Sequence, residues 1–426
     1  MATHYRRIAE FLREVFGGRG LTDVTRLEPH FGPSRPPVPG RSEISGEAVA
    51  ARWALPDLPG PAREVLAGAA VPDPAVYTRN VENFIGTAKL PIGLAGPLRV
   101  NGAHARGDYY VPLATTEAAL VASYSRGAQL VTEAGGAAAI VLNEGIARAP
   151  GFAFETMAEA GRFVGWAALS MDTFKAVTRE TSSYAELVDA YFTIEGNHVY
   201  MRLDYTTGDA AGQNMVTIAA EAICRHIEAH APVRPRYWFV EANMSGDKKA
   251  TAQSFLSVRG KKASAEIVVP AALIERRLHT TPRAMADYAR MSMVGGLMSG
   301  SIGVQGHYAN GLAALFIACG QDAACVAEGA VGITRFELRE DGGLYASVTL
   351  PNLIVGTVGG GTGLPTQKAC LDILGLSGAG HARALAEVAA ALSLAGELSI
   401  IGALCAGQFT RAHRDLARGH APSRTG

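Results

Sequence analysis

The chain has 426 residues, of which 48% are hydrophobic and only 18% charged, a composition that excludes a disordered or fibrous protein and predicts a large buried core. Its 39 Lys and Arg residues balance 39 Asp and Glu residues, so no overall charge directs it to nucleic acid or to an anionic membrane. The five cysteines, odd in number and without a C-x-x-C pair, favour a reducing compartment over a disulfide framework or a cysteine zinc site.

Residues 1–75 are predicted to form a small, loosely helical N-terminal arm. Residues 1–16 have the apolar spacing of an amphipathic helix and not the composition of a secretory signal. The Pro-rich stretch 31–40 is expected to be a linker without regular structure, and a second Pro-rich stretch ends near Pro61.

Residues 151–244 are predicted to form one compact inserted domain. A short strand at 151–155 precedes a helical stretch at 156–180, and residues 190–207 alternate like a hairpin about the turn EGN. A helix at 215–231 and a strand at 237–242 follow. This β-α-β-β-α-β order is that of a ferredoxin-like unit.

The flanking segments, residues 76–150 and 245–426, share long helical patterns rich in Ala and Gly and are expected to pack together as one larger domain. The predicted fold class is therefore α+β. The longest apolar run, residues 388–407, is about the length of a membrane span, roughly 20 residues. It contains Glu397 and several glycines and has no flanking positive cluster, which favours a buried helix or a subunit contact and a soluble, cytoplasmic protein.

One carboxylate stands out in the stretch ALFIACGQDAAC, residues 314–325. The apolar spacing predicts a buried helix, and Asp322 falls on its apolar face. Because desolvation penalises an isolated charge, this carboxylate must either be paired or be shifted towards its neutral form.

Three other stretches carry chemistry, and each has a structural alternative. GDAAGQN, residues 208–214, joins a strand to a helix start, where free N–H groups favour a phosphate, but an ordinary tight turn fits as well. GTVGGGTG, residues 356–363, is either a close approach to a ligand or a structural glycine turn. In SGDKK, residues 245–249, the lysines are either a solvated surface or a positive charge for a developing oxyanion.

Two further positions are ambiguous. Glu117 follows two threonines at the start of an apolar helix, where a carboxylate is commonly a capping residue. His226 and His230 lie four residues apart on a predicted helix, but the pattern is not H-E-x-x-H and no third ligand is evident, which favours an exposed helix face over a metal site.

Taken together, the motifs resemble those of a known family. In chain order they are ENFIGTAKLPIGLAGPL (82–98), ATTEAALVAS (114–123), GDAAGQNMV (208–216), DKK (247–249), GHYAN (306–310), IACGQDAA (317–324) and GTVGGGTGLPTQKACLDILG (356–375). They resemble the successive signatures of the 3-hydroxy-3-methylglutaryl-coenzyme A (HMG-CoA) reductase family over about residues 80–418. The resemblance is closer to the biosynthetic branch shared with eukaryotes and archaea than to the degradative bacterial branch.

This resemblance implies an enzyme of isoprenoid biosynthesis. Its reaction would reduce (S)-HMG-CoA by two successive hydrides, through a hemithioacetal and an aldehyde, to (R)-mevalonate and free CoA. It implies NADPH as the cofactor, with NADH possible, and no metal. A homodimer or higher oligomer with shared active sites is also implied, because residues 82–86 resemble the segment that the family uses at its dimer contact.

The resemblance also implies catalytic roles for four residues. Lys248 would stabilise negative charge on the carbonyl oxygen. Glu117 would supply a proton to the alcohol, which requires a carboxyl with a raised pKa. Asp322 would bridge Lys248 and Glu117 by hydrogen bonds, and His413, on a mobile C-terminal segment, would protonate the departing CoA thiolate.

Binding residues carry over in the same way. Those implied to hold the hydroxymethylglutaryl group are Arg148, Asp247 and Lys249. Those implied to line the CoA site are Ser123, Arg126, Arg290, His307 and Asn310. Those implied to contact the dinucleotide are Ser182, Ser183, Tyr184, Asp209, Gly212, Gln213, Asn214, Met215, Gly359 and Gly360.

The sequence departs from the family pattern at one cofactor position, and two alternative functions stay open. Ser183 stands where the eukaryotic enzymes have an arginine near the 2′-phosphate of the cofactor, which leaves the choice between NADPH and NADH undecided. A reductase of the same fold acting on another acyl-CoA is one alternative. A non-catalytic CoA- or nucleotide-binding regulator is the other, and the retention of all four catalytic matches argues against it.

Overall fold

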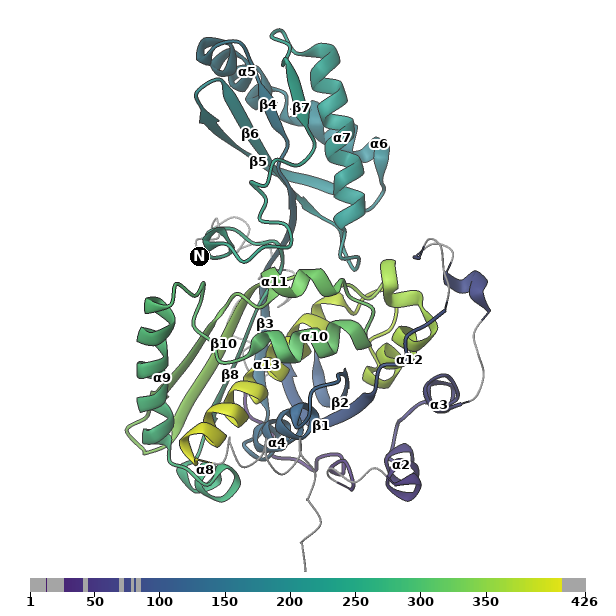
Figure 1. Cartoon of the computed structure of the whole chain (residues 1–426), viewed down its shortest axis with the longest axis vertical. Coiled ribbons are helices and arrows are strands. Elements are labelled where there is room, and N and C mark those ends of the chain that lie inside the picture. The colour runs from purple at the N-terminus through teal and green to yellow at the C-terminus, as the bar shows by residue number, and fades with distance from the viewer. Residues whose placement is uncertain are drawn as a thin grey trace, which may run out of the picture.

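Two lobes make up the described part of the chain, which comprises residues 13, 27–40, 45–68, 73–77, 80–81 and 86–407 of a computed structural model (Figure 1). The sheet of the larger lobe consists of β1 (Ile92–Gly102), β2 (Arg106–Ala114), β3 (Ala137–Arg148), β8 (Gly260–Val269), β9 (Ile333–Leu338) and β10 (Leu344–Leu353). Its order is β2-β1-β3-β8-β10-β9. The β1–β3 pair is parallel, and the other neighbours run antiparallel.

The smaller lobe consists of β4 (Gly151–Ala153), α5 (Met157–Leu169), α6 (Met171–Thr181), β5 (Glu186–Glu195), β6 (His198–Thr206), α7 (Gln213–His230) and β7 (Tyr237–Phe239). Its strands are antiparallel in the order β7-β4-β6-β5. The helical stretch expected at 156–180 is divided in two. The Ser170 hydroxyl donates to the Trp166 carbonyl (2.9 Å), a local bond that competes with the helix ladder where α5 ends.

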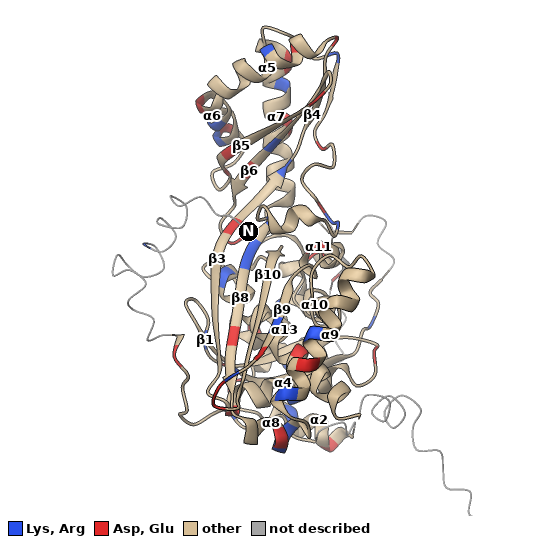
Figure 2. Cartoon of the chain, turned by 90° about the vertical axis from the view of Figure 1, so that its left-hand side faces the viewer, with Lys and Arg blue, Asp and Glu red and all other residues tan. Residues whose placement is uncertain are grey.

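Strand β3 serves both lobes. Residues 137–145 pair with β1 and β8, and residues 146–148 pair with β6. Charged residues lie on β3 and β8 where these strands leave the larger lobe (Figure 2). Glu144 Oε2 lies 3.9 Å from Lys261 Nζ, and Glu144 Oε1 lies 2.5 Å from Arg383 Nη2. One continuous strand therefore joins the two lobes, and ion pairs between Glu144 and its two cationic neighbours lie where it passes from one lobe to the other.

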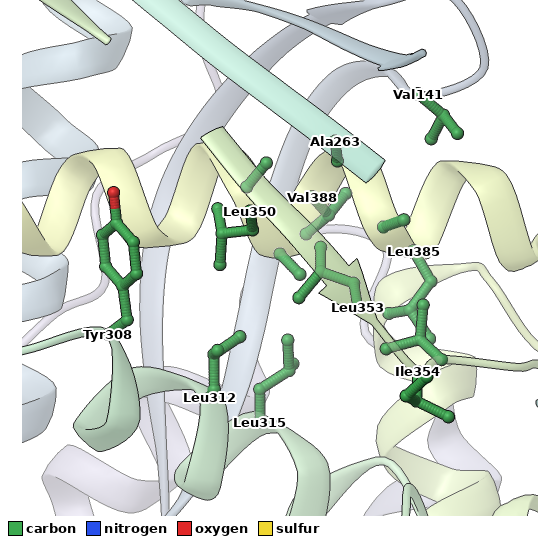
Figure 3. Packing of buried hydrophobic residues seen from close by; sticks show 14 of the residues in the cluster. Val141, Ala263, Tyr308, Leu312, Leu315, Leu350, Leu353, Ile354, Leu385 and Val388 are labelled. Carbon is green, nitrogen blue, oxygen red and sulfur yellow. The ribbon is translucent and has the colours of Figure 1, made fainter. Parts of the chain in front are cut away.

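The helices of the larger lobe are α4 (Leu120–Glu133), α8 (Ala271–Leu278), α9 (Pro282–Met298), α10 (Tyr308–Ala318), α11 (Val326–Gly329), α12 (Pro365–Leu374) and α13 (Ala382–Cys405). Helix α13 packs on β3, β8 and β10 and is covered by α4 and α10. Figure 3 shows Leu385 and Val388 of α13 among side chains from β8, β10 and α10. By length and composition α13 could cross a membrane, but 83% of its most apolar window is buried in the fold. The expected buried helix is thus confirmed up to Cys405.

The N-terminal arm lies against the larger lobe. It contains α2 (Gly46–Trp53), α3 (Gly60–Ala67) and a 3-10 turn at Pro74–Tyr77. As expected, residues 31–40 form neither helix nor strand. The Arg99 guanidinium donates to the carbonyls of His30, Gly32 and Pro33 at 2.7–2.9 Å, which ties the Pro-rich stretch to β1. The helix expected at 1–16 lies outside the described residues, apart from Arg13.

Candidate active site

The prediction that Asp322 lies on a buried helix face is wrong. Asp322 lies at the turn between α10 and a short 3-10 helix. Helix α10 ends at Ala318, and Gly320 adopts a left-handed φ of 69°. A Cβ at Gly320 would lie 2.4 Å from the Gly361 carbonyl oxygen, so this turn needs glycine. The break leaves Asp322 exposed, as the N-cap of the 3-10 helix Ala323–Cys325.

Asp322 forms an ion pair with Lys248. Its Oδ2 lies 2.9 Å from Lys248 Nζ, and its Oδ1 accepts from the Ala324 N–H at 3.0 Å. Partial burial alone would raise the pKa of Asp322, but the hydrogen bonds from Lys248 and Ala324 hold it below its usual value. The same pair raises the pKa of Lys248, chiefly through the hydrogen bond to Asp322. Both groups are therefore charged at neutral pH.

The backbone of Lys248 is held in an unusual conformation. Its φ is 56°, in the left-handed region that disfavours residues other than glycine. The Lys248 N–H donates to Oε1 of Glu328 at 3.0 Å. Glu328 is fully buried, which raises its pKa, and it is paired with the buried guanidinium of Arg259. This pair, which the sequence motifs did not reveal, holds the Lys248 backbone in place.

Asp247 is held between two guanidinium groups. Its Oδ2 lies 2.8 Å from Arg148 Nη1, and its Oδ1 lies 2.7 Å from Arg259 Nη2. Although burial alone would raise it, these cations hold the pKa of Asp247 below its usual value. Exposed Lys249 donates from Nζ to the Asp247 carbonyl oxygen at 2.9 Å. The structure thus brings together the three residues implied to hold the hydroxymethylglutaryl group.

The first residue of α7 reaches this cluster. Gln213 Nε2 lies 3.3 Å from Asp322 Oδ2 and 3.1 Å from Cys325 Sγ. Gly212 precedes it with φ 80°, and no side chain caps the helix start. The start of α7 therefore combines uncapped backbone N–H groups with a side chain at the Lys248–Asp322 pair.

The glycine-rich stretch 356–363 contacts both the loop 208–212 and the Asp322 turn. A Cβ at Gly356 would lie 2.5 Å from the Ala211 backbone nitrogen, which leaves room only for glycine. Gln321 holds this backbone in place, since its Nε2 donates to the Gly356 carbonyl at 3.0 Å and its Oε1 accepts from the Gly356 N–H at 2.8 Å. Gly359 and Gly360 are exposed, and a Cβ added at either would have no atom within 4 Å. Gly356 is therefore a glycine that the turn itself requires. Gly359 and Gly360, in contrast, have open space beside them.

Other residues implied at the cofactor have varied surroundings. The Asp209 carboxylate accepts from the Gly380 N–H at 2.7 Å and the Ala382 N–H at 3.1 Å, so it caps the start of α13. Ser182 Oγ accepts from the backbone N–H groups of residues 184 and 185. The remaining side chains of this set are exposed or half-buried: Ser183, Tyr184, Asn214 and Met215.

Glu117 lies in the loop before α4 and not in the first turn of that helix. Its Oε1 accepts from Asn310 Nδ2 at 3.3 Å, and its N–H donates to Thr115 Oγ1 at 3.0 Å. Among the described residues, no hydrogen bond or ion pair joins Glu117 to Lys248 or Asp322. The expected bridge from Asp322 to Glu117 is therefore not formed. The Asp322 oxygens accept from Lys248, Gln213 and the Ala324 N–H, whereas Glu117 accepts from Asn310.

Residues implied at the CoA site meet one turn of α13. Ser123 Oγ lies 2.9 Å from Ser399 Oγ, and Arg126 donates to the Ser399 hydroxyl and carbonyl at 2.9–3.0 Å. His307 Nδ1 lies 3.1 Å from Oε1 of buried Glu397. The only sequence signal for Glu397 is a charge within an apolar run, and nothing in the motifs points to Ser399.

Three implied or ambiguous positions lie apart from this cluster. Arg290 is exposed on α9 and pairs with Asp287. His226 and His230 stack with ring centroids 4.2 Å apart, and in the part of the chain that the structure describes no group of three or more His, Cys, Asp or Glu residues is placed to hold a metal. His413 and residues 82–85 lie outside the described residues.

An ion-paired lysine lies beside a glycine-rich loop and an uncapped helix start within an α+β fold, an arrangement that suits an enzyme acting on an anionic ligand. The family profile described as hydroxymethylglutaryl-coenzyme A reductase matches residues 52–418. The chain belongs to this family, which confirms the resemblance seen in the motifs.

Several archaeal relatives carry the name 3-hydroxy-3-methylglutaryl-coenzyme A reductase. The Aeropyrum pernix protein is 43% identical over 378 residues, which cover 87% of this chain and 90% of the relative. The Haloferax volcanii protein is 45% identical over 344 residues, which cover 79% of this chain and 85% of that relative. A Dictyostelium discoideum reductase is 38% identical, and the match covers 79% of this chain and 62% of that protein. These relatives agree with the predicted branch.

The fold is also that of a solved reductase. The class II enzyme of Streptococcus pneumoniae, bound to NADPH in open conformations, matches with a TM-score of 0.69 at 20% identity and covers 85% of this chain and 97% of that one. At this identity the likeness shows the fold alone, and it confirms the predicted α+β class.

Proposed function

We propose that the protein is an HMG-CoA reductase that converts (S)-HMG-CoA to (R)-mevalonate and free CoA. The observation that carries this proposal is the Lys248–Asp322 pair, set between the start of α7 and the glycine-rich stretch in a chain of this family. The pair keeps an ammonium group charged and fixed in direction, which is what a developing oxyanion requires.

Lys248 stabilises the negative charge that forms on the carbonyl oxygen when hydride adds to the thioester, and again when it adds to the aldehyde. Because Glu328 and Asp322 hold the backbone and the side chain of Lys248, little reorganisation accompanies the reaction. Glu117, held by Asn310, donates the proton that completes the alcohol. His413 protonates the departing CoA thiolate, so that CoA leaves as the free thiol.

The residues around the start of α7 fit a nicotinamide dinucleotide. The uncapped N–H groups at Gln213 suit a phosphate, and Gly359 and Gly360 leave open space for a ligand against the backbone. When bound, the dinucleotide supplies the hydride. Because the Asp209 carboxylate caps α13, we assign Asp209 the role of shaping the loop 208–212 and leave the cofactor contacts to the rest of the implied set. NADPH is the proposed cofactor.

The hydroxymethylglutaryl carboxylate is proposed to meet Lys249. Of the three residues implied at this end, Lys249 is exposed, whereas Arg148 is buried and already bonded to Asp247 and Thr217. Arg148 thus orients Asp247, which is free to accept from the substrate hydroxyl through its remaining lone pairs. Ser123, Arg126, His307 and Asn310 are proposed to line the CoA arm, and Arg290 to reach its phosphates.

The assembly is proposed to be a cytoplasmic homodimer with active sites at the subunit interface. Large apolar side chains are exposed along α9, and they are Met291, Met293, Val294, Leu297 and Met298. A second copy of the chain would cover this face and would bring a partner surface next to Arg290. Within each chain, residues 151–244 are proposed as the cofactor-binding domain, and residues 76–150 with 245–426 as the substrate-binding and dimerisation domain.

One substrate panel separates the alternatives. Purified protein is mixed with NADPH or NADH and with either HMG-CoA or acetyl-CoA, which lacks the distal carboxylate, and the nicotinamide absorbance is followed. The proposal predicts oxidation with HMG-CoA only. Oxidation with acetyl-CoA alone would favour a reductase of another acyl-CoA. Binding of CoA by calorimetry without any oxidation would favour a non-catalytic regulator and would overturn the proposal.

A further inference from the structure

A buried carboxylate on α13 controls one of the residues proposed at the CoA arm. Glu397 is fully buried, and its two oxygens accept four hydrogen bonds. Oε2 accepts from the Gly306 N–H at 2.7 Å and from Thr334 Oγ1 at 2.8 Å. Oε1 accepts from the His307 N–H at 2.9 Å and lies 3.1 Å from His307 Nδ1. One carboxylate thus fixes both the backbone and the ring of His307.

The ring of His307 is fixed from a second side as well. Tyr124 stacks on it with centroids 5.4 Å apart and an angle of 21° between the planes. Tyr124 is itself buried and packs closely on two glycines, since a Cβ at Gly311 or Gly396 would lie 2.4 Å from its side-chain atoms. The imidazole therefore has one orientation, set by Glu397 at its edge and by Tyr124 on its face.

This arrangement decides which ring nitrogen carries the proton. A carboxylate in its ionised form only accepts hydrogen bonds, so with Glu397 in that form the Nδ1 that faces it carries hydrogen. In the neutral ring Nε2 is then the acceptor, and among the described residues it has no hydrogen-bond partner. The His307 side chain is 10% exposed, so part of it reaches the surface.

We infer that Glu397 is a positioning residue for acyl-CoA binding, which holds His307 with its proton on Nδ1 and thereby presents Nε2 to the acyl-CoA. This inference rests on the proposed function, because His307 is placed at the CoA arm only in that proposal. Glu397 itself touches neither substrate nor cofactor.

Helix α13 offers a matched control. Glu387 is also fully buried on α13, and its Oε2 accepts from the His104 and Ala105 N–H groups at 2.7–2.8 Å. These partners belong to the turn between β1 and β2 and not to the proposed site. Glu387→Gln and Glu397→Gln both remove a buried carboxylate from α13. Only Glu397→Gln also releases His307.

The first test is a kinetic cycle. Glu397→Gln is expected to raise the KM for HMG-CoA about tenfold with a smaller change in kcat, the size expected when a hydrogen bond to a charged group is lost. The KM for NADPH should not change, and Glu387→Gln should leave both KM values unchanged. In a His307→Gln background, Glu397→Gln should add no further increase, because its effect passes through His307. Additive effects of the two substitutions would overturn the inference.

The second test needs neither a variant of Glu397 nor enzymatic activity. The ¹⁵N resonances of His307 in the labelled wild-type protein are assigned by their loss in His307→Gln. The inference predicts the neutral ring with hydrogen on Nδ1, and a ring with hydrogen on Nε2 would overturn it. Because this readout is independent of turnover, a wild-type protein that oxidises no cofactor would refute the proposed function without deciding the tautomer.

Discussion

Lys248 and Asp322 each stabilise the charged form of the other. We predict that Asp322→Asn, which preserves the shape of the side chain, lowers kcat by at least about a hundredfold, the cost of losing one preorganised electrostatic contact in an active site. The fold should survive, because Asp322 is exposed at a turn. Steady-state kinetics and thermal unfolding measure the two effects.

The matched control for this substitution is Asp372→Asn. It removes an exposed Lys368–Asp372 pair of similar length, 2.8 Å, on α12. A surface pair of this kind contributes little, so kcat should stay at the wild-type value. Equal losses in both variants would contradict a catalytic role for Asp322.

The same variant changes the pH profile. The hydrogen bond that Lys248 donates to Asp322 raises the pKa of Lys248, so the ammonium persists to higher pH than in a free lysine and activity is lost as pH rises through the raised value. Without that carboxylate, the alkaline limb of kcat/KM for the residual activity should move to lower pH. An unmoved limb would show that another group controls it.

The sequence could identify the residue types of the site but not the contacts that hold them. Lys248 and Asp322 belong to recognisable motifs. The support from Arg259 and Glu328 arises because residues 247–248, 259 and 328 meet only in the folded chain. Such long-range pairs leave no periodic or spacing signal.

At the level of elements, the contact between two loops depends on Gly356. We predict that Gly356→Ala raises the KM for NADPH and destabilises the protein by about 1–3 kcal/mol, because its methyl group would meet the Ala211 backbone nitrogen. Urea unfolding and initial rates measure these effects. Gly363→Ala lies in the same stretch, where a Cβ has nothing within 4 Å, and should be nearly neutral. Similar effects of both substitutions would contradict the packing argument.

Helix α13 has a pH-dependent stability through Glu387. Burial raises the pKa of Glu387 to about 7 from its usual value of 4.5. The folded protein therefore holds a proton that the unfolded chain has lost, and stability falls as pH rises from 4.5 to 7 and is level above it. Relative to Glu387→Gln, wild type should lose up to about 3 kcal/mol across this window, measured by urea unfolding. A pH-independent difference would contradict the raised pKa.

Local patterns predicted most elements because apolar periodicity reports the face that a helix or strand buries. The hairpin of β5 and β6 and the long helix α13 follow directly from it. The pattern failed at 314–325, where the apolar spacing continues through Gly320 although the helix does not. The turn there depends on the close approach of Gly361, which is remote in sequence.

For the whole molecule, the exposed face of α9 is expected to be the dimer contact. We predict that Leu297→Glu with Met298→Glu converts a dimer to a monomer in sedimentation equilibrium and lowers activity, since charges oppose burial of that face. Leu169→Glu replaces an equally exposed leucine of α5 and should remain dimeric. A monomeric wild type, or a doubly substituted dimer, would contradict this assignment.

The central claim is that one site carries out both reduction steps, and the stoichiometry of a complete reaction tests it most directly. With limiting HMG-CoA and excess NADPH, nicotinamide absorbance and free thiol are measured to completion. The proposed reaction predicts two NADPH oxidised for each thiol released, with mevalonate as the product. Release of one thiol for each NADPH, or no oxidation with either NADPH or NADH, would contradict it.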